Sequence, residues 1–236
     1  MAGLKIFGTN PDDQPKPRQS FKDDIVGRFR SGHQISGRPA SLSEWRVTTG
    51  DPDVAAKVHD LLGGDEPQKW ATQKEDNLEV FTASKEVEII LEGPKALRQR
   101  MQLWSRSNKL VIDSDGETLA DGAPDPDAEL SFAERKKKYD DGVGPGPSIT
   151  VYFRLADEPD LGIFMFQTGS WSLARELAGN DIAGQLEAIG GKATATLRLE
   201  EVEFVAKTGP QAGKTVRYTK SAIENVEPVR ELAAAA

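Results

Sequence analysis

Two apolar, aromatic runs separated by an acidic turn impose the strongest constraint on how this chain can fold. Residues 149–155 read ITVYFRL, residues 163–166 read IFMF, and the turn between them is ADEPDLG. The runs are rich in β-branched and aromatic residues, which is typical of two strands joined in a hairpin. The four side chains expected to face a buried core are Val151, Phe153, Phe164 and Phe166.

Short alternating runs in the first 113 residues predict further strands. They lie at residues 25–30, 43–50, 77–82, 86–93 and 109–113. Two helices are expected between them. The first begins after Asp51, a capping residue followed by proline, and ends at Gly63. The second rests on Leu97, Met101 and Trp104, which recur at helical spacing. The expected order is therefore β-β-α-β-β-α-β.

Residues 114–147 differ from the segments on either side because they are rich in Gly, Pro and Asp. The stretch DAELSFAERKKKY at 127–139 nevertheless has acidic residues near its start and lysines near its end, the order that a helix dipole favours. We interpret this segment as a linker with a short embedded helix.

Two helices and two strands are expected after the hairpin. Ser170 is a suitable N-cap for the first helix, and Ile182 and Leu186 mark the buried face of the second. Residues 190–207 and 214–220 then read as paired strands.

The longer of these strands has an interrupted pattern. Its apolar residues occupy odd positions up to Leu199 and even positions from Val202 onward. Because a strand alternates its faces strictly, this change predicts a β-bulge near Glu200 and Glu201.

Together these patterns predict an α+β fold with mixed or antiparallel sheets and a few packed helices. Two sheet-bearing halves, joined by the linker, either pack together or form one sheet. The expected divisions are an extended arm at 1–20, an N-terminal half at 21–113, the linker at 114–147, a C-terminal half at 148–228 and a tail at 229–236.

Composition excludes several classes of site. The sequence has no cysteine, so it has no disulfide, thiolate metal site or cysteine nucleophile. A formal net charge of −8 argues against a broad, non-specific grip on nucleic acid. The apolar runs are shorter than the roughly 18 to 20 residues that cross a bilayer, and the start lacks the apolar core of a secretory signal. We expect a soluble, cytoplasmic protein.

Two motif-like stretches fail on spacing. GPQAGKT at 209–215 resembles a phosphate-binding loop, but it has too few residues between its glycines and continues as a strand. DSDGE at 113–117 lacks the full ligand series of a calcium loop. His33 and His59 have no metal-binding spacing and are expected at the surface, and there is no G-x-S-x-G elbow. We expect no enzyme activity and no catalytic, cofactor or metal site.

The candidate partner-binding residues lie in two places. Trp45, Trp104 and Trp171 fall on strand or helix faces and are expected in the core. Trp70 lies in a polar stretch, is expected to be exposed and is a candidate interface anchor. The embedded helix supplies the other candidates, which are Phe132, Lys136, Lys137 and Tyr139. The alternative interpretation of that helix is a solvated basic face.

Six phrases, in this order, resemble the recombination directionality factors of actinobacterial phages, the accessory proteins of large serine integrases. They are DDIVGRFRSG, LSEWRVTTGDPDVA, NLEVFT, FRLADEPDLGIFMFQTGSWSL, GGKATATLRLEEVEF and VRYTK, and the resemblance covers residues 20 to 226. None of the phrases is a catalytic motif.

The resemblance implies a protein that binds the integrase at its coiled-coil arm and recognises no DNA sequence of its own. It would allow excision between attL and attR and inhibit integration between attP and attB in the host cytoplasm. A preference of about 1.4 kcal/mol for one arrangement of the integrase shifts the equilibrium tenfold. Many relatives carry a cysteine-containing segment that suggests a metal-binding knuckle, and this chain has DSDGETLADGAPDPDAE instead.

Two other functions remain open. A replication accessory protein that binds single-stranded DNA would need a basic groove with aromatic residues. Its support is the first fifty residues, where eight basic residues exceed five acidic ones. The residues concerned are Arg28, Phe29, Arg30, Trp45 and Arg46. The hypothesis that the protein is a hydrolase rests only on its 38 Asp and Glu carboxylates.

Overall fold

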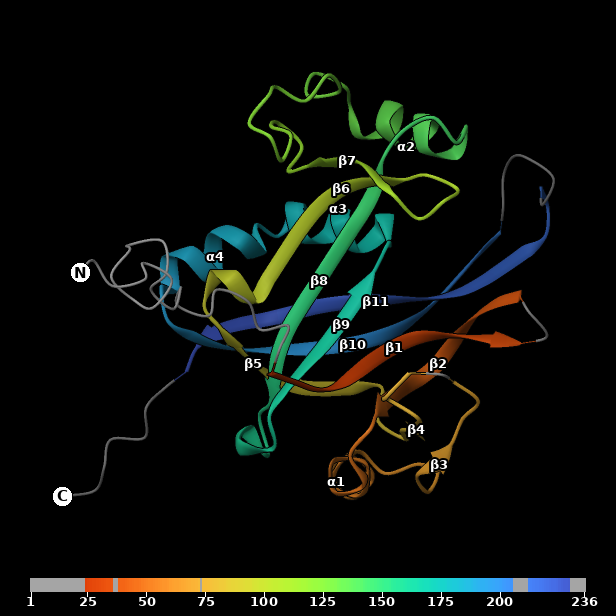
Figure 1. The fold of residues 1–236 in the computed structure, drawn as a ribbon, viewed down its shortest axis with the longest axis vertical. Coiled ribbons are helices and arrows are strands. Elements are labelled where there is room, and N and C mark those ends of the chain that lie inside the picture. Colours follow the sequence, from red (N-terminus) through yellow and green to blue (C-terminus); the bar gives the residue numbers. More distant parts are fainter. Residues whose placement is uncertain (1–23, 36–37, 73, 206–211, 230–236) are drawn as a thin grey trace, which may run out of the picture.

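The computed structural model describes residues 24–35, 38–72, 74–205 and 212–229, and Figure 1 shows their arrangement. The expected arm at 1–20, and all of the expected tail at 229–236 except its first residue, lie outside the described residues.

The described residues form an α+β fold, as expected from the sequence. Their strands are β1 (Ile25–Ile35), β2 (Arg38–Thr49), β3 (Gln68–Lys69), β4 (Leu78–Phe81), β5 (Glu86–Glu92), β6 (Leu97–Trp104), β7 (Leu110–Ser114), β8 (Gly146–Leu155), β9 (Ile163–Thr168), β10 (Lys192–Val205) and β11 (Thr215–Pro228). The α-helices are α1 (Pro52–Leu62), α2 (Phe132–Asp140), α3 (Trp171–Gly179) and α4 (Ile182–Ile189). Two 3-10 turns, η3 (Pro94–Ala96) and η4 (Pro159–Leu161), complete the described elements.

These strands form one mixed sheet. Its main path runs β11-β10-β5-β8-β9-β1-β2-β4-β3, and β6 pairs with both β8 and β7 (Figure 1). The β1–β9 pair is parallel and the other pairs are antiparallel. Groups of strands from the first part of the chain (β1 to β7) and from the last part (β8 to β11) are interleaved in the sheet, so both parts contribute to a single sheet.

An aromatic core lies under the middle of the sheet. The ring of Phe29 on β1 meets three others edge to face, with centroids 5.2 to 5.7 Å away; these belong to Trp45, Phe153 and Phe164. The hairpin of β8 and β9 packs as predicted, since the four side chains expected in the core are no more than 1% exposed. The alternation of that hairpin therefore determines which face of the sheet is buried.

The helices follow their sequence signals. The Asp51 side chain accepts hydrogen bonds from the first turn of α1, which Gly63 ends. Ser170 caps α3, as predicted. Leu173 and Leu177 of α3, with Ile182 and Leu186 of α4, are buried. The embedded helix expected between 114 and 147 is α2, whose cap Ser131 forms a reciprocal capping box with Glu134.

The helix expected at Leu97, Met101 and Trp104 is wrong, because residues 97–104 form β6. Three apolar residues at this spacing fit a helix, but they do not exclude a strand. The strand prevails because six consecutive residues of β6 pair with β8, from Leu97 opposite Val151 to Gln102 opposite Gly146. Trp104, expected in the core, ends this strand and is 55% exposed.

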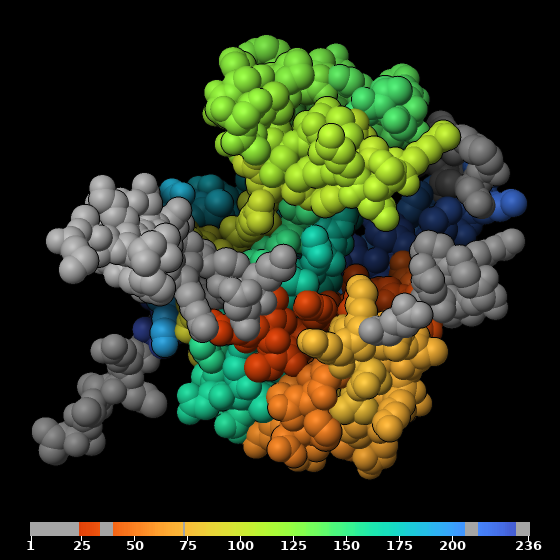
Figure 2. All heavy atoms as spheres, viewed as in Figure 1, coloured from red at the N-terminus to blue at the C-terminus, as the bar shows by residue number. Residues whose placement is uncertain are grey.

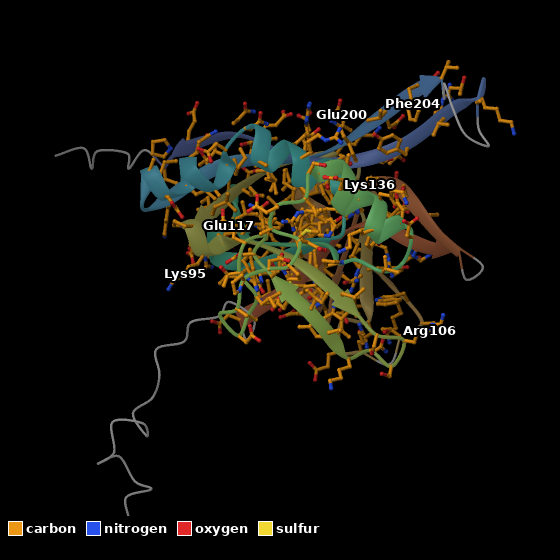
Figure 3. The ribbon with its side chains drawn as sticks, turned by 90° about the horizontal axis from the view of Figure 1, so that it is seen from above. Lys95, Arg106, Glu117, Lys136, Glu200 and Phe204 are labelled. Atoms are coloured by element: carbon orange, nitrogen blue, oxygen red, sulfur yellow. The ribbon has the colours of Figure 1, made fainter. Side chains whose placement is uncertain are left out.

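The β-bulge expected near Glu200 and Glu201 is also wrong. The β10–β11 ladder is continuous from Thr196 to Val205, and its register shifts between Thr194 and Thr196 instead. On the opposite strand Asn225 has φ 55°, within the irregularity. A bulge at Glu200 is unnecessary because Val202 and Phe204 belong to the end of the hairpin that extends beyond the rest of the sheet (Figures 1 and 3).

Candidate functional site

The face of the sheet opposite the aromatic core forms an open groove. It encloses about 1250 Å³ and is lined mainly by β1, β2, β6, β8 and β9, with residues from 70 to 79 on one side. Figure 2 shows this face between the segment of β6, β7 and α2 and the segment of β1 to β4. Strand alternation explains its character: Phe29 points into the core, so its neighbours Arg28 and Arg30 line the groove.

The groove is basic although the whole chain is acidic. Among the described residues, its basic lining residues are Arg28, Arg30, Arg46, Lys74, Arg98 and Arg100, and its one acidic lining residue is Glu79. Three further carboxylates, those of Asp76, Asp113 and Asp115, pair with these arginines. Basic residues therefore exceed the carboxylates that contact them, and the local charge is opposite to that of the chain.

Ion pairs hold several of the arginines in place. The Arg30 guanidinium donates to the Thr48 hydroxyl at 3.0 Å and to the Asp76 carboxylate at 2.9 Å. On the other side, Arg100 Nε donates to the Asp113 carboxylate at 2.7 Å. These contacts orient the guanidinium groups, while Arg98 keeps 59% of its side chain exposed.

The surroundings of Asp76 and Asp113 also change the pKa of these two carboxyl groups. Burial raises the pKa of Asp76, but hydrogen bonds from Thr48 and Arg30 outweigh it, so that the pKa lies below its ordinary value of 3.8. The same balance lowers the pKa of Asp113, where burial opposes hydrogen bonds from Arg100 and Gln102. Both carboxylates are therefore charged at neutral pH.

Aromatic side chains line the groove from both sides. The exposed Trp104 lies at the end of β6, and Tyr152 lies on β8 between the two sides. Trp70 is half-buried rather than exposed as expected. Its indole NH donates to the Asp76 carbonyl at 2.7 Å, and the Arg46 guanidinium lies 4.4 Å from its ring centre.

The other four candidates from the sequence lie elsewhere, on α2. Phe132 and Tyr139 pack against Trp171 of α3, with ring centroids 5.2 and 5.7 Å away. Lys136 lies 5.9 Å from the same ring, and Lys137 pairs with Asp141 at 2.6 Å. The structure thus separates Trp70 from α2. On α2 the aromatic rings dock the helix on α3, and Lys137 is 76% exposed.

A third surface was missed by the sequence analysis. Val202 pairs with Tyr218 and Phe204 with Val216 across β10 and β11, so these four residues share one face. We call them the hairpin strip. Phe204 and Tyr218 are 47% and 40% exposed, with ring centroids 6.3 Å apart. Figure 3 labels Phe204 on this hairpin. The change from odd to even apolar positions was its signal, and it marks an exposed apolar face rather than a bulge.

The structure also shows where the two histidines and the GPQAGKT stretch lie. Within the described segments there is no group of three or more His, Cys, Asp or Glu residues placed to hold a metal ion. His33 and His59 were expected at the surface, but both are half-buried, the first on β1 and the second on α1. Of the GPQAGKT stretch, the described part leads into β11, a strand.

Comparison with known families decides how these surfaces are interpreted. A family model described as "Recombination directionality factor-like" (Gp3-like) matches residues 26–224. The chain belongs to this family. The match includes the four described α-helices and nearly the whole described sheet of this recombination directionality factor-like protein, and it agrees with the resemblance found in the sequence phrases. No solved structure matches the chain. Among the described helices, none has the length and apolar character needed to cross a membrane.

Proposed function

We propose that this protein is a recombination directionality factor that binds a phage serine integrase by protein–protein contact. It activates excision between attL and attR and inhibits integration between attP and attB, in the cytoplasm of the bacterial host. The observation that carries the proposal is the family match over residues 26–224. The protein needs no catalysis for this role, because a partner that prefers one arrangement of the integrase redirects the reaction through its differential affinity.

The hairpin strip is the contact surface that the structure supports best. It places two aromatic and two aliphatic side chains on one side of a two-stranded arm that extends beyond the sheet. Exposed aromatic residues on such a feature are typical anchors of protein interfaces. Its occupant in this proposal is the coiled-coil region of the integrase, whose helices supply side chains that complement an apolar strip.

The candidates from the sequence extend this proposal. Lys137 and Tyr139 are the exposed members of the α2 group, with Tyr139 46% exposed. Phe132 and Lys136 support the same helix from its packed side. Trp70, which lines the groove, is the fifth proposed contact residue.

The test is recombination in vitro with the cognate integrase, with attL and attR in one reaction and attP and attB in the other. Addition of the protein should produce excision and suppress integration. Phe204→Asp should abolish both effects and weaken binding to the DNA-free integrase. The matched control is Val111→Asp, which places the same charge at a 58% exposed position on β7.

Two outcomes would contradict the proposal. If the wild-type protein changes neither reaction, the directionality role is wrong. If Phe204→Asp and Val111→Asp both behave like the wild type, the role stands but the hairpin strip is not the contact surface.

A further inference from the structure

Arginines flank the groove on the strands at its two sides, Arg98 on β6 and Arg28 on β1. Arg98 on β6 lies opposite Thr150 on β8, which in turn lies opposite Gln167 on β9. Two residues further along β8, Tyr152 lies opposite Met165 on β9, and Met165 lies opposite Arg28 on β1. Basic residues thus border both sides of a strip of uncharged polar and thioether side chains.

The size and lining of the groove point to an extended anionic ligand. Its volume of about 1250 Å³ exceeds the ~300–1,000 Å³ that is usual for small-molecule pockets. Its arginines suit phosphate groups, because a guanidinium offers several donors in a planar fork. The side chains of Arg98 and Arg28 are 59% and 38% exposed, so both are accessible to a ligand.

The aromatic residues of the groove indicate which class of anionic ligand it fits. Trp104 is 55% exposed at the β6 side of the groove, and Tyr152 lies within it. Indole and phenol rings stack on unpaired bases, whereas a duplex keeps its bases in the stack and a stretch of Asp and Glu residues has no aromatic ring to stack on them. A basic groove with interspersed aromatic rings is the arrangement that binds single strands.

We propose that this groove binds single-stranded nucleic acid, with phosphates at Arg28 and Arg98 and a base stacked on Trp104. This activity goes beyond the directionality role and does not depend on it. The net charge of −8 disfavours a broad grip on phosphates outside the groove. With about two phosphates, log Kd should change with log salt with a slope near 1.4, because single strands contribute roughly 0.7 per phosphate.

The experiment is fluorescence anisotropy with a labelled oligothymidylate over a series of salt concentrations. Arg98→Glu should weaken binding about tenfold or more and lower the salt slope by about 0.7. Trp104→Ala should weaken binding, again by roughly tenfold, whereas Trp104→Phe should retain most of it because it keeps a stacking ring. The matched charge control is Arg217→Glu on β11, a 77% exposed position outside the groove, which should bind like the wild type.

Three results would overturn the proposal. The first is no salt-sensitive binding by the wild-type protein, and the second is an equal loss in Arg98→Glu and Arg217→Glu. The third is tighter binding of a labelled polyglutamate peptide or of duplex DNA than of the oligothymidylate. Thermal unfolding of each variant, recorded in parallel, distinguishes a lost contact from a lost fold.

Discussion

Arg46 and Glu79 form a nearly buried ion pair across β2 and β4, with Arg46 Nε 2.6 Å from the Glu79 carboxylate. Their side chains are only 5% and 9% exposed. The same guanidinium lies over the ring of Trp70, so one arginine connects the sheet to the segment that borders the groove. Removing either partner would leave a buried charge without compensation.

We therefore expect Arg46→Met to lower the free energy of unfolding by about 3–5 kcal/mol, measured by urea denaturation. The double variant Arg46→Met with Glu79→Leu should recover much of this loss, because it leaves no unpaired charge. A single-variant loss below about 1 kcal/mol would show that the pair is more hydrated than the structure indicates.

Asp76 should make the free energy of unfolding depend on pH. Because its pKa is lowered in the folded protein, its contribution is present above the ordinary value of 3.8 and is lost as the pH falls through the folded-state pKa. The unfolding free energies of the wild type and of Asp76→Asn should therefore differ at neutral pH and converge in acid. Urea titrations from about pH 7 to pH 3 test this, and a constant difference over that range would contradict it.

Gly64 should tolerate no side chain. Its φ is +100°, and an added Cβ would lie 2.0 Å from the Phe81 carbonyl oxygen. Gly116 is a matched control, since its φ is +106° but an added Cβ meets nothing within 4 Å. Gly64→Ala should lower the melting temperature clearly more than Gly116→Ala, because both incur the backbone strain and only the first adds a clash. Equal shifts in calorimetry would refute this difference.

The two sides of α2 should respond differently to substitution. Phe132→Ala removes a ring packed on Trp171 and stacked under Arg175, whose guanidinium lies 4.4 Å from the ring centre, so it should destabilise the protein. Lys137→Glu changes an exposed side chain and should alter stability by less than about 0.5 kcal/mol. If α2 contacts the integrase as proposed, Lys137→Glu should weaken binding measured by calorimetry. Unchanged binding would leave α2 as scaffold.

Local sequence patterns were sufficient where the residues that define a helix or strand all lie within it or next to it. The capped start at Asp51 and the glycine end at Gly63 define α1 within eleven residues, and the alternation in β8 and β9 identifies their buried face. Both predictions are confirmed because the residues that decide them are neighbours in the sequence.

Sequence patterns gave wrong predictions where the structure of a segment depends on parts of the chain that are distant in the sequence. Residues 97–104 become a strand because β8, some fifty residues later, pairs with them. Val202 and Phe204 require no bulge because the hairpin runs past the core, so no buried face constrains them. Neither fact is encoded in the local spacing of apolar residues.

The sequence by itself determined the α+β class, the absence of cysteine chemistry, the acidic charge and the family. It also showed that Arg28 and Arg30 alternate with a core residue, but alternation only establishes that a strand has two faces. Tertiary structure decided what the outer face meets: it brought Arg98 and Trp104 to the same groove and left Phe204 and Tyr218 of the hairpin strip exposed. The physical reason is that strand order and register depend on pairing between distant segments, which no single segment specifies.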